Sequence, residues 1–177
     1  MASDKALFTI TTRTEKEDYR KFLYFASFRK SPKSLLIIFG FSAAGALFGA
    51  VYGNIFSVLN VILLWIGISI FVCLGVCFRA EQKVIQLQYA GKENAFKTTQ
   101  HLEFHDKNII IDDSNVPGIV KVGYDKIKRV FETKDYYYFY IIDNQASMIR
   151  KSDIETTVDI RTFFQKRFQQ RFKARKD

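Results

Sequence analysis

The sequence predicts a membrane α-helical hairpin joined to an α+β domain, whose antiparallel sheet or partial barrel is capped by a C-terminal helix. Three observations predict this fold class. Residues 34–78 contain no Asp, Glu, Lys, Arg or His, short alternating apolar segments follow from residue 99, and an aromatic stripe at helical spacing comes after them. The chain of 177 residues is therefore expected to combine two membrane helices with a strand-rich domain.

The uncharged stretch is too long for one membrane span and has the length of two. An α-helix rises about 1.5 Å per residue, so about 20 apolar residues cross a hydrocarbon core of roughly 30 Å. Residues 34–78 thus divide into spans at about 35–52 and 55–78, with the turn residues Gly53 and Asn54 between them. Two buried helices of a soluble protein are the alternative, but the rest of the chain is too charged and too short to enclose them.

The charges beside the spans predict the orientation of the hairpin. Residues 1–33 hold eight Lys or Arg against four Asp or Glu, Arg79 and Lys83 follow the second span, and the turn carries no charge. Because positive flanks stay inside, we expect a two-span protein of the cell membrane with both termini in the cytoplasm. A cleaved signal peptide is not expected. The basic flanks suit an anionic leaflet, although topology and solubility alone also explain them.

Glycines recur every four residues in the first span, at Gly45, Gly49 and Gly53. Small residues at this spacing form a groove in which a second helix backbone approaches closely, as packing in lipid requires. The sequence leaves two partners for this groove. One is the second span of the same chain, and the other is the same groove of another copy in a homodimer.

The N-terminal segment, residues 1–33, is expected to form a strand and then an amphipathic helix. Residues 6–12 alternate loosely between apolar and polar side chains, and Thr14 with Glu17 matches the capping box that opens a helix. Apolar residues then recur at helical spacing until Pro32 ends the segment. We expect this helix to lie against the membrane surface or against the C-terminal domain.

Residues 79–98 are expected to continue the second membrane helix as a connector, because good helix formers and spaced apolar residues reach about Ala90. Residues 99–177 form the C-terminal domain, where period-two alternation between turn residues predicts antiparallel strands. These strands are expected at residues 99–104, 109–111, 119–124, 127–133, 136–142 and 146–150. We also expect residues 6–12 to pair with this sheet across the inserted hairpin.

The domain is expected to end in a helix that covers the sheet. Ser152 with Glu155, or Thr156 with Asp159, matches its capping box. The apolar stripe of this helix consists of Ile160, Phe164, Phe168 and Phe172. Cations lie on the other side of the helix and after it, where they interact favourably with the partial negative charge at the helix C-terminus. They are also candidates for contact with anionic lipid headgroups. These candidates are Arg167, Arg171, Lys173, Arg175 and Lys176.

His101, Glu103 and His105 are the candidate residues for metal chemistry. On a strand, alternation places these three side chains on one face. Two imidazoles and a carboxylate are ligands that zinc accepts, and an open fourth position can activate water. Neighbours two apart on a strand are about 7 Å from each other, however, so three in a row converge on one ion only at a bend. The solvated outer face of an amphipathic strand explains the same residues.

Other active-site patterns are absent from the sequence. It has no Gly-rich phosphate loop, no nucleophile elbow and no Cys-x-x-Cys pair. No cofactor and no catalytic residue are therefore expected. Lys126, Lys128 and Arg129 precede an aromatic run, but a domain held at a membrane makes a nucleic-acid partner unexpected.

Several short runs of residues, together with the order of the parts, carry a family resemblance. A strand precedes Thr14, Asp18, Tyr19 and Phe22, and the hairpin and the strand-rich unit follow. Within that unit the runs are residues 105–109, 124–127 leading to Val130, 136–142 and 148–154. In these features the chain resembles the YcxB-like family of bacterial membrane proteins. The resemblance implies a bacterial cell membrane and a C-terminal half-open barrel like that of pleckstrin-homology (PH) domains, and it implies no particular reaction.

Two function hypotheses from different classes follow. The first is a non-enzymatic module, in which the hairpin presents the PH-like domain to a membrane protein partner or to anionic lipid headgroups. The second is a membrane-bound, metal-dependent enzyme or sensor centred on His101, Glu103 and His105. A pore is a third hypothesis, but the chain has only two spans and no ionisable group within them.

Overall fold

The computed structural model describes residues 5–30, 32–54, 56–89, 98–115, 117–142 and 145–174. The chain divides into two compact units. The first combines Met1–Glu15 with Asn94–Asp177 and contains the strands and the last helix, and the second, Lys16–Glu93, contains the long helices. The second unit is therefore an insertion between the first strand and the rest of the first unit.

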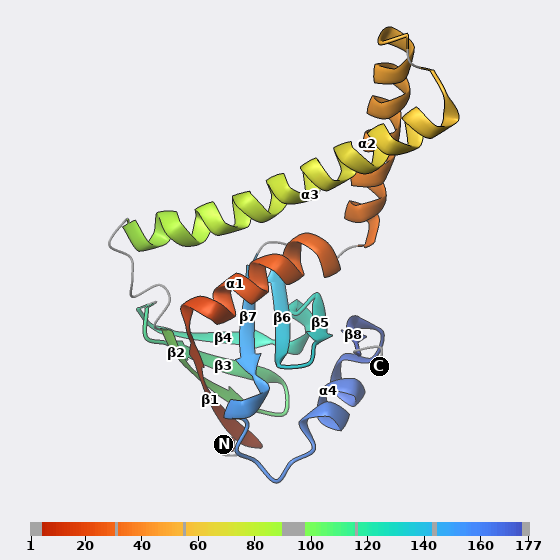
Figure 1. Ribbon diagram of the computed structural model, residues 1–177. Coiled ribbons are helices and arrows are strands. Elements are labelled where there is room, and N and C mark those ends of the chain that lie inside the picture. Colours follow the sequence, from red (N-terminus) through yellow and green to blue (C-terminus); the bar gives the residue numbers. More distant parts are fainter. Residues whose placement is uncertain are drawn as a thin grey trace. The chain divides into compact units, whose positions relative to one another are not determined.

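Within the described ranges, the first unit holds two open, four-stranded sheets and one α-helix (Figure 1). One sheet has the order β1-β2-β3-β4 and the other β7-β6-β5-β8, and all neighbouring strands are antiparallel except β5 and β8. The bounds are β1 Phe8–Thr14, β2 Thr98–Phe104, β3 Asn108–Asp113, β4 Ile119–Gly123, β5 Arg129–Glu132, β6 Tyr136–Ile142, β7 Gln145–Arg150 and β8 Phe172–Lys173. The predicted fold class, two apolar helices with an antiparallel α+β unit and a C-terminal helix, is confirmed.

The N-terminal strand belongs to the first sheet. β1 pairs with β2 along its whole length, beginning with Phe8 opposite Phe104. Its side chains alternate between buried and exposed, and the rings of Phe8 and Phe104 stack with their centroids 4.6 Å apart. The predicted pairing of residues 6–12 with the sheet across the insertion is confirmed. The strand thus belongs to the first unit and the helix that follows it to the second, whereas the sequence analysis grouped both in one segment, residues 1–33.

A phenylalanine-rich core joins both sheets to the last helix, α4 (Ile160–Phe168). Phe104 of the first sheet, Phe139 of the second and Phe164 of α4 are all buried. The ring of Phe164 meets that of Phe139 edge to face at a centroid distance of 5.0 Å and lies 5.7 Å from that of Phe104. Aromatic pairs of this kind add about 0.5–1.5 kcal/mol each beyond the burial of their area. The helix therefore closes the core with its aromatic stripe, as the sequence predicts.

Both ends of α4 differ from the sequence prediction. The N-cap is Asp159, whose carboxylate accepts the backbone N–H of Thr162 at 3.1 Å and its hydroxyl at 2.6 Å, so both predicted capping boxes are wrong. The helix ends at Phe168 because Gln169 has a φ of 46° and a ψ of −116°, a backbone conformation outside the helical region. Phe172 is still buried, but it lies on β8 and not on the helix.

All regular elements of the second unit are helices in the part of the chain that the structure describes. It begins with α1 (Lys16–Tyr24), which continues as a π-helical turn, η1 (Phe25–Arg29). The two long helices are α2 (Pro32–Tyr52) and α3 (Val58–Tyr89). Both are long and apolar enough to cross a membrane. The expected continuation of the second span as a polar helix beyond residue 78 is confirmed by the length of α3.

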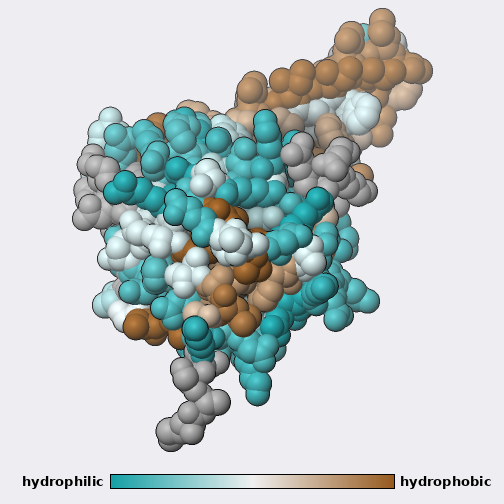
Figure 2. Space-filling model, turned by 90° about the horizontal axis from the view of Figure 1, so that it is seen from below, coloured by the Kyte–Doolittle hydropathy of each residue, from teal (hydrophilic) through white to brown (hydrophobic). Residues whose placement is uncertain are grey.

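The apolar side chains of α2 and α3 are mostly exposed. Phe41 on α2 and Phe71 on α3 each leave 78% of their surface uncovered. Figure 2 shows the visible part of these helices in brown, whereas most of the visible α+β surface is teal or white. Water-soluble proteins rarely leave a continuous apolar surface of this extent uncovered. The two helices are therefore candidate membrane spans.

Candidate functional site

The three candidate metal ligands on and beside β2 do not form one cluster. The Nδ1 of His101 is 2.8 Å from Oγ1 of Thr11 on the paired strand. Glu103 and His105 do come together, with Oε2 of Glu103 3.3 Å from Nε2 of the buried His105. Among the residues that the structure describes, no three His, Cys, Asp or Glu side chains are arranged to hold a metal ion. The structure therefore brings together two of the three predicted ligands and places the third in a separate contact.

Two of the predicted headgroup contacts, Arg167 and Arg171, form contacts inside the α+β unit. Nη2 of Arg167 lies 2.9 Å from Oδ1 of Asp106, and its guanidinium lies over the ring of Tyr124 at 4.8 Å from the centroid. Nη1 of Arg171 donates to the backbone carbonyl oxygens of Tyr124 and Ile127 at 2.9 and 2.8 Å. Arg167 therefore joins α4 to the turn between β2 and β3, and Arg171 joins the residues after α4 to the turn before β5.

The other three predicted headgroup contacts follow at the end of the chain. Lys173 is exposed on β8. Arg175 and Lys176 lie outside the described residues.

The small residues of α2 that are buried are not the predicted glycines, which are exposed. The buried column consists of Ser42, Ala46 and Ala50. A Cβ added at Gly45 would lie 3.7 Å from Cδ1 of Ile68 on α3, whereas a Cβ added at Gly49 would have no neighbour within 4 Å. Gly53 follows the last residue of α2 and donates its N–H to the carbonyl of Gly49 at 3.0 Å. Of the three predicted glycines, Gly45 is therefore the one shown next to α3, and Gly49 faces open space.

A charged network joins α1 to the polar end of α3. Oε1 of Glu81 is 3.0 Å from Nε of Arg20 and accepts a hydrogen bond from the hydroxyl of Tyr24 at 2.9 Å. Arg20 also pairs with Glu17, one turn earlier on α1, at 2.8 Å. The hydrogen bond to Glu81, together with desolvation, raises the pKa of Tyr24. The network holds α1 against α3 and engages the carboxylate of Glu81.

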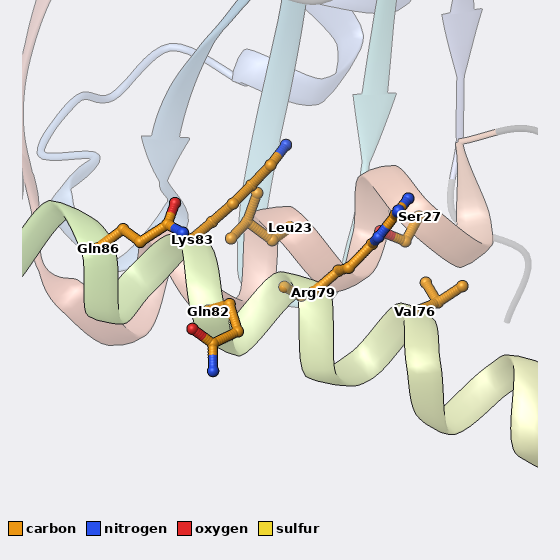
Figure 3. A pocket seen from close by; sticks show the side chains of 8 residues that line it. Leu23, Ser27, Val76, Arg79, Gln82, Lys83 and Gln86 are labelled. Carbon is orange, nitrogen blue, oxygen red and sulfur yellow. The ribbon is translucent and has the colours of Figure 1, made fainter.

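A cavity of about 480 Å³ lies beside this network and is lined by α1, η1 and α3 (Figure 3). Its volume falls within the range of about 300–1,000 Å³ found for small-molecule sites. The lining residues are Leu23, Ser27, Val76, Arg79, Ala80, Gln82, Lys83 and Gln86. In Figure 3 the side chains of Arg79 and Lys83 extend from α3 towards Leu23 and Ser27. The cavity therefore combines an apolar wall with two cations and several neutral polar groups.

Among the described residues, two cations and no acid line this cavity. As far as the structure describes the chain, neither Arg79 nor Lys83 forms an ion pair or a hydrogen bond with another side chain. Glu81, which lies between them in sequence, is engaged by Arg20 and Tyr24. Guanidinium and ammonium groups without a protein partner create a positive potential and offer strong hydrogen-bond donors. The cavity has the chemistry of an anion site.

Sequence reasoning used Arg79 and Lys83 only to orient the hairpin. A signal for a shared surface was present, because Val76, Arg79 and Lys83 are three and four residues apart and lie on one face of a helix. The sequence did not show that α1 and η1 lie along this face and complete the cavity. That contact is tertiary, and helical spacing alone does not predict it.

Comparisons with known proteins give one family match. A family model described as YcxB-like protein matches residues 104–165, from the last residue of β2 into α4. The match confirms the resemblance that the sequence indicates and places it in the α+β unit. Neither the curated proteins nor the solved structures contain a match to the chain.

Proposed function

We propose that this chain, whose residues 104–165 are YcxB-like, is an integral membrane protein that presents a PH-like binding domain at the cytoplasmic face of the cell membrane. In this proposal α2 and α3 anchor the protein, and both termini are cytoplasmic. The α+β unit then acts as a binding or scaffolding module. Its partner is a second membrane protein, and anionic headgroups add contacts.

The exposed apolar surface of α2 and α3 is the observation that carries this proposal. The described part of each helix is long enough to span a bilayer core, and few of its apolar residues are buried by the chain. The cations beside the helices support the orientation, because Arg79 and Lys83 follow the uncharged stretch and the described turn residues carry none. A hairpin with its turn outside satisfies both observations.

A protein partner is supported by the edge strand β4. This strand lies at the end of the first sheet, and Ile119 and Val120 on it are 69% and 48% exposed. An exposed sheet edge with apolar side chains is a common docking site for an extended segment of another protein. Binding is proposed in preference to the metal-dependent enzyme or sensor, because His101 lies apart from Glu103 and His105.

Thiol labelling tests the membrane topology. In a chain with Cys73→Ala and Cys77→Ala, we expect Ser57→Cys in the turn to react with an impermeant maleimide on intact cells. Lys126→Cys, which is exposed on the α+β unit, is expected to react only after the membrane is made permeable. Ser57 is preferable to Asn54, because Asn54 has a φ of 51° that most side chains adopt with strain. Purification of the protein without detergent, or labelling of both thiols from outside, would refute the proposal.

Photo-crosslinking in cells tests the partner. A photoreactive residue at Ile119 is expected to capture a membrane protein, whereas one at the exposed Lys134, in the turn before β6, is the matched control. Replacing Val120 by Glu should abolish capture from position 119 without unfolding the sheet, since Val120 is already half exposed. Equal capture from both positions would show that the β4 edge is not the binding surface.

A further inference from the structure

We propose that the cavity lined by Arg79 and Lys83 binds the phosphate headgroup of an anionic phospholipid. This inference rests on the proposed insertion of α2 and α3 into a membrane. It assigns a ligand to the base of the hairpin, where the sequence indicates only a basic flank that suits an anionic leaflet.

The position of the cavity along α3 corresponds to the border between hydrocarbon and headgroups. Arg79 is the first charged residue after the uncharged stretch of residues 34–78. The lining runs from Val76, inside that stretch, to Gln86 beyond it, which is about 15 Å of helix at about 1.5 Å per residue. An acyl chain beside Val76 and a headgroup beside Arg79 and Lys83 then follow the order of the bilayer itself.

The polar lining selects for negative charge. Arg79 has a planar guanidinium that can donate to two phosphate oxygens at once, and Lys83 adds a compact positive charge. Ser27 and Gln86 offer further hydrogen-bond donors to the same cavity. Because the lining residues that the structure describes include no carboxylate, they offer no partner to the ammonium of a zwitterionic headgroup. A headgroup with a net negative charge needs no such partner, so phosphatidylglycerol fits better than phosphatidylcholine.

The chain itself leaves these cations for a ligand. Glu81 is the only acid in residues 79–89, and Arg20 and Tyr24 already engage it. Glu17, the next acid on α1, also contacts Arg20, at 2.8 Å. Arg20 therefore engages both of these carboxylates. Arg20 is thus paired with carboxylates, whereas Arg79 and Lys83 line the cavity.

Native mass spectrometry of the full-length protein in detergent tests the inference, with phosphatidylglycerol and phosphatidylcholine as the probes. We expect one retained phosphatidylglycerol and at least about tenfold weaker binding of phosphatidylcholine. The double variant R79Q/K83Q should weaken phosphatidylglycerol binding by about tenfold or more, because two charge-assisted contacts are lost. The matched control R29Q/K33Q removes the same charge next to α2 but outside the cavity, and should change binding less than about threefold.

Three outcomes would overturn the inference. They are equal binding of the two lipids, equal loss of binding in the two double variants, and displacement of the lipid by excess inorganic phosphate, which would indicate a site for free phosphate.

Unchanged Trp65 fluorescence shows that a variant is folded. If R79Q/K83Q does not fold, the single variants R79Q and K83Q are each expected to weaken binding about threefold, and no weakening in either refutes the site. A protein that purifies without detergent instead refutes the proposed membrane insertion.

Discussion

Oγ1 of Thr12 donates a hydrogen bond to Oδ2 of Asp153 at 2.9 Å and accepts one from the backbone N–H of Arg150 at 3.1 Å. Thr12 lies on β1, before the inserted helices, and the other two residues lie near the end of the chain. The side chain of Thr12 is buried, with 1% of the residue exposed. One hydroxyl therefore fastens the segment before the insertion to the segment after it.

We expect Thr12→Val to lower the free energy of unfolding by about 1–3 kcal/mol, because the N–H of Arg150 loses its acceptor in a buried site. Valine keeps the shape of threonine, so the change isolates the hydroxyl. Thr9→Val, on the exposed face of the same strand, is the matched control and should stay within about 0.5 kcal/mol. Near-UV circular dichroism during urea unfolding of the detergent-purified protein measures both. Equal stability of the two variants would contradict the role of Thr12.

Glu132 on β5 is a buried carboxylate between two cations. Its Oε1 is 2.8 Å from Nζ of Lys151, and its Oε2 is 3.2 Å from Nε of Arg161. The side chain of Glu132 is 4% exposed, against 28% for Lys151 and 48% for Arg161. The two cations thus keep access to water while the acid does not.

We expect Glu132→Ala to destabilise the α+β unit by about 2 kcal/mol, less than the ~3–5 kcal/mol of a fully buried pair, because the partly exposed cations can be hydrated after the change. Glu155→Ala, at an exposed position that follows β7, is the control and should have little effect. Urea unfolding of both variants at neutral pH compares them. A loss at Glu132 no larger than that at Glu155 would mean that the ion pairs contribute nothing measurable.

The long helices and the N-terminal strand could be predicted because each depends on a local pattern. The absence of charge in residues 34–78 and the alternation in residues 6–12 are visible without tertiary information. The end of α4 was not predictable in this way. The stripe from Phe168 to Phe172 continues the helical spacing, and neither Gly nor Pro interrupts it. Only Gln169, with its φ of 46°, and the pairing of β8 with β5 end the helix.

The candidate site was harder to predict because it depends on which helix faces meet. Arg79 and Lys83 resemble ordinary topology-determining cations until α1 and η1 are seen beside them. The packing of α2 has the same difficulty. Columns through Gly45 and through Ala46 are adjacent and both are lined by small residues, so composition does not identify the one that is buried. A tertiary contact decides each case.

Tyr124 makes the α+β unit sensitive to alkaline pH. Its hydroxyl donates to the backbone carbonyl of His105 at 2.8 Å, and burial raises the pKa of Tyr124 to about 12. Burial likewise raises the pKa values of Tyr137 and Tyr140 to about 12. Because the folded state favours the neutral phenols, their stabilising effect is complete below the ordinary tyrosine pKa of about 10 and is lost as the pH rises through about 12.

We expect Tyr124→Phe to lower the free energy of unfolding at neutral pH by about 1–2 kcal/mol, because the carbonyl of His105 loses a buried donor. The variant should also lose less stability than the parent between about pH 10 and about pH 12, since one shifted group is gone. Thermal unfolding across this range measures both effects. Tyr89→Phe is the control, because Tyr89 is 89% exposed. Identical pH profiles for the parent and Tyr124→Phe would show that Tyr124 is not one of the groups responsible.

The buried column of α2 predicts which small residues hold the hairpin together. Trp65, the single tryptophan, reports on this contact, because its Nε1 donates to the carbonyl of Phe39 on α2 at 3.1 Å. We expect Ala46→Leu to overpack the contact between the two helices and to lower the free energy of unfolding by about 1–3 kcal/mol. The fluorescence of Trp65 should shift as well. Gly49→Leu should leave that fluorescence unchanged, because a Cβ at Gly49 has no neighbour within 4 Å.

Crosslinking of the same two variants in membranes separates the two partners that the glycine spacing allows. Loss of crosslinked dimers in Gly49→Leu, with Trp65 unchanged, would assign the face of Gly49 to a second copy, as close packing of helices in lipid requires small residues on both sides. An unchanged crosslinking pattern would leave lipid as the neighbour of that face. A shift of Trp65 fluorescence in Gly49→Leu as large as that in Ala46→Leu would contradict the buried column itself, because the glycine face would then also contact α3.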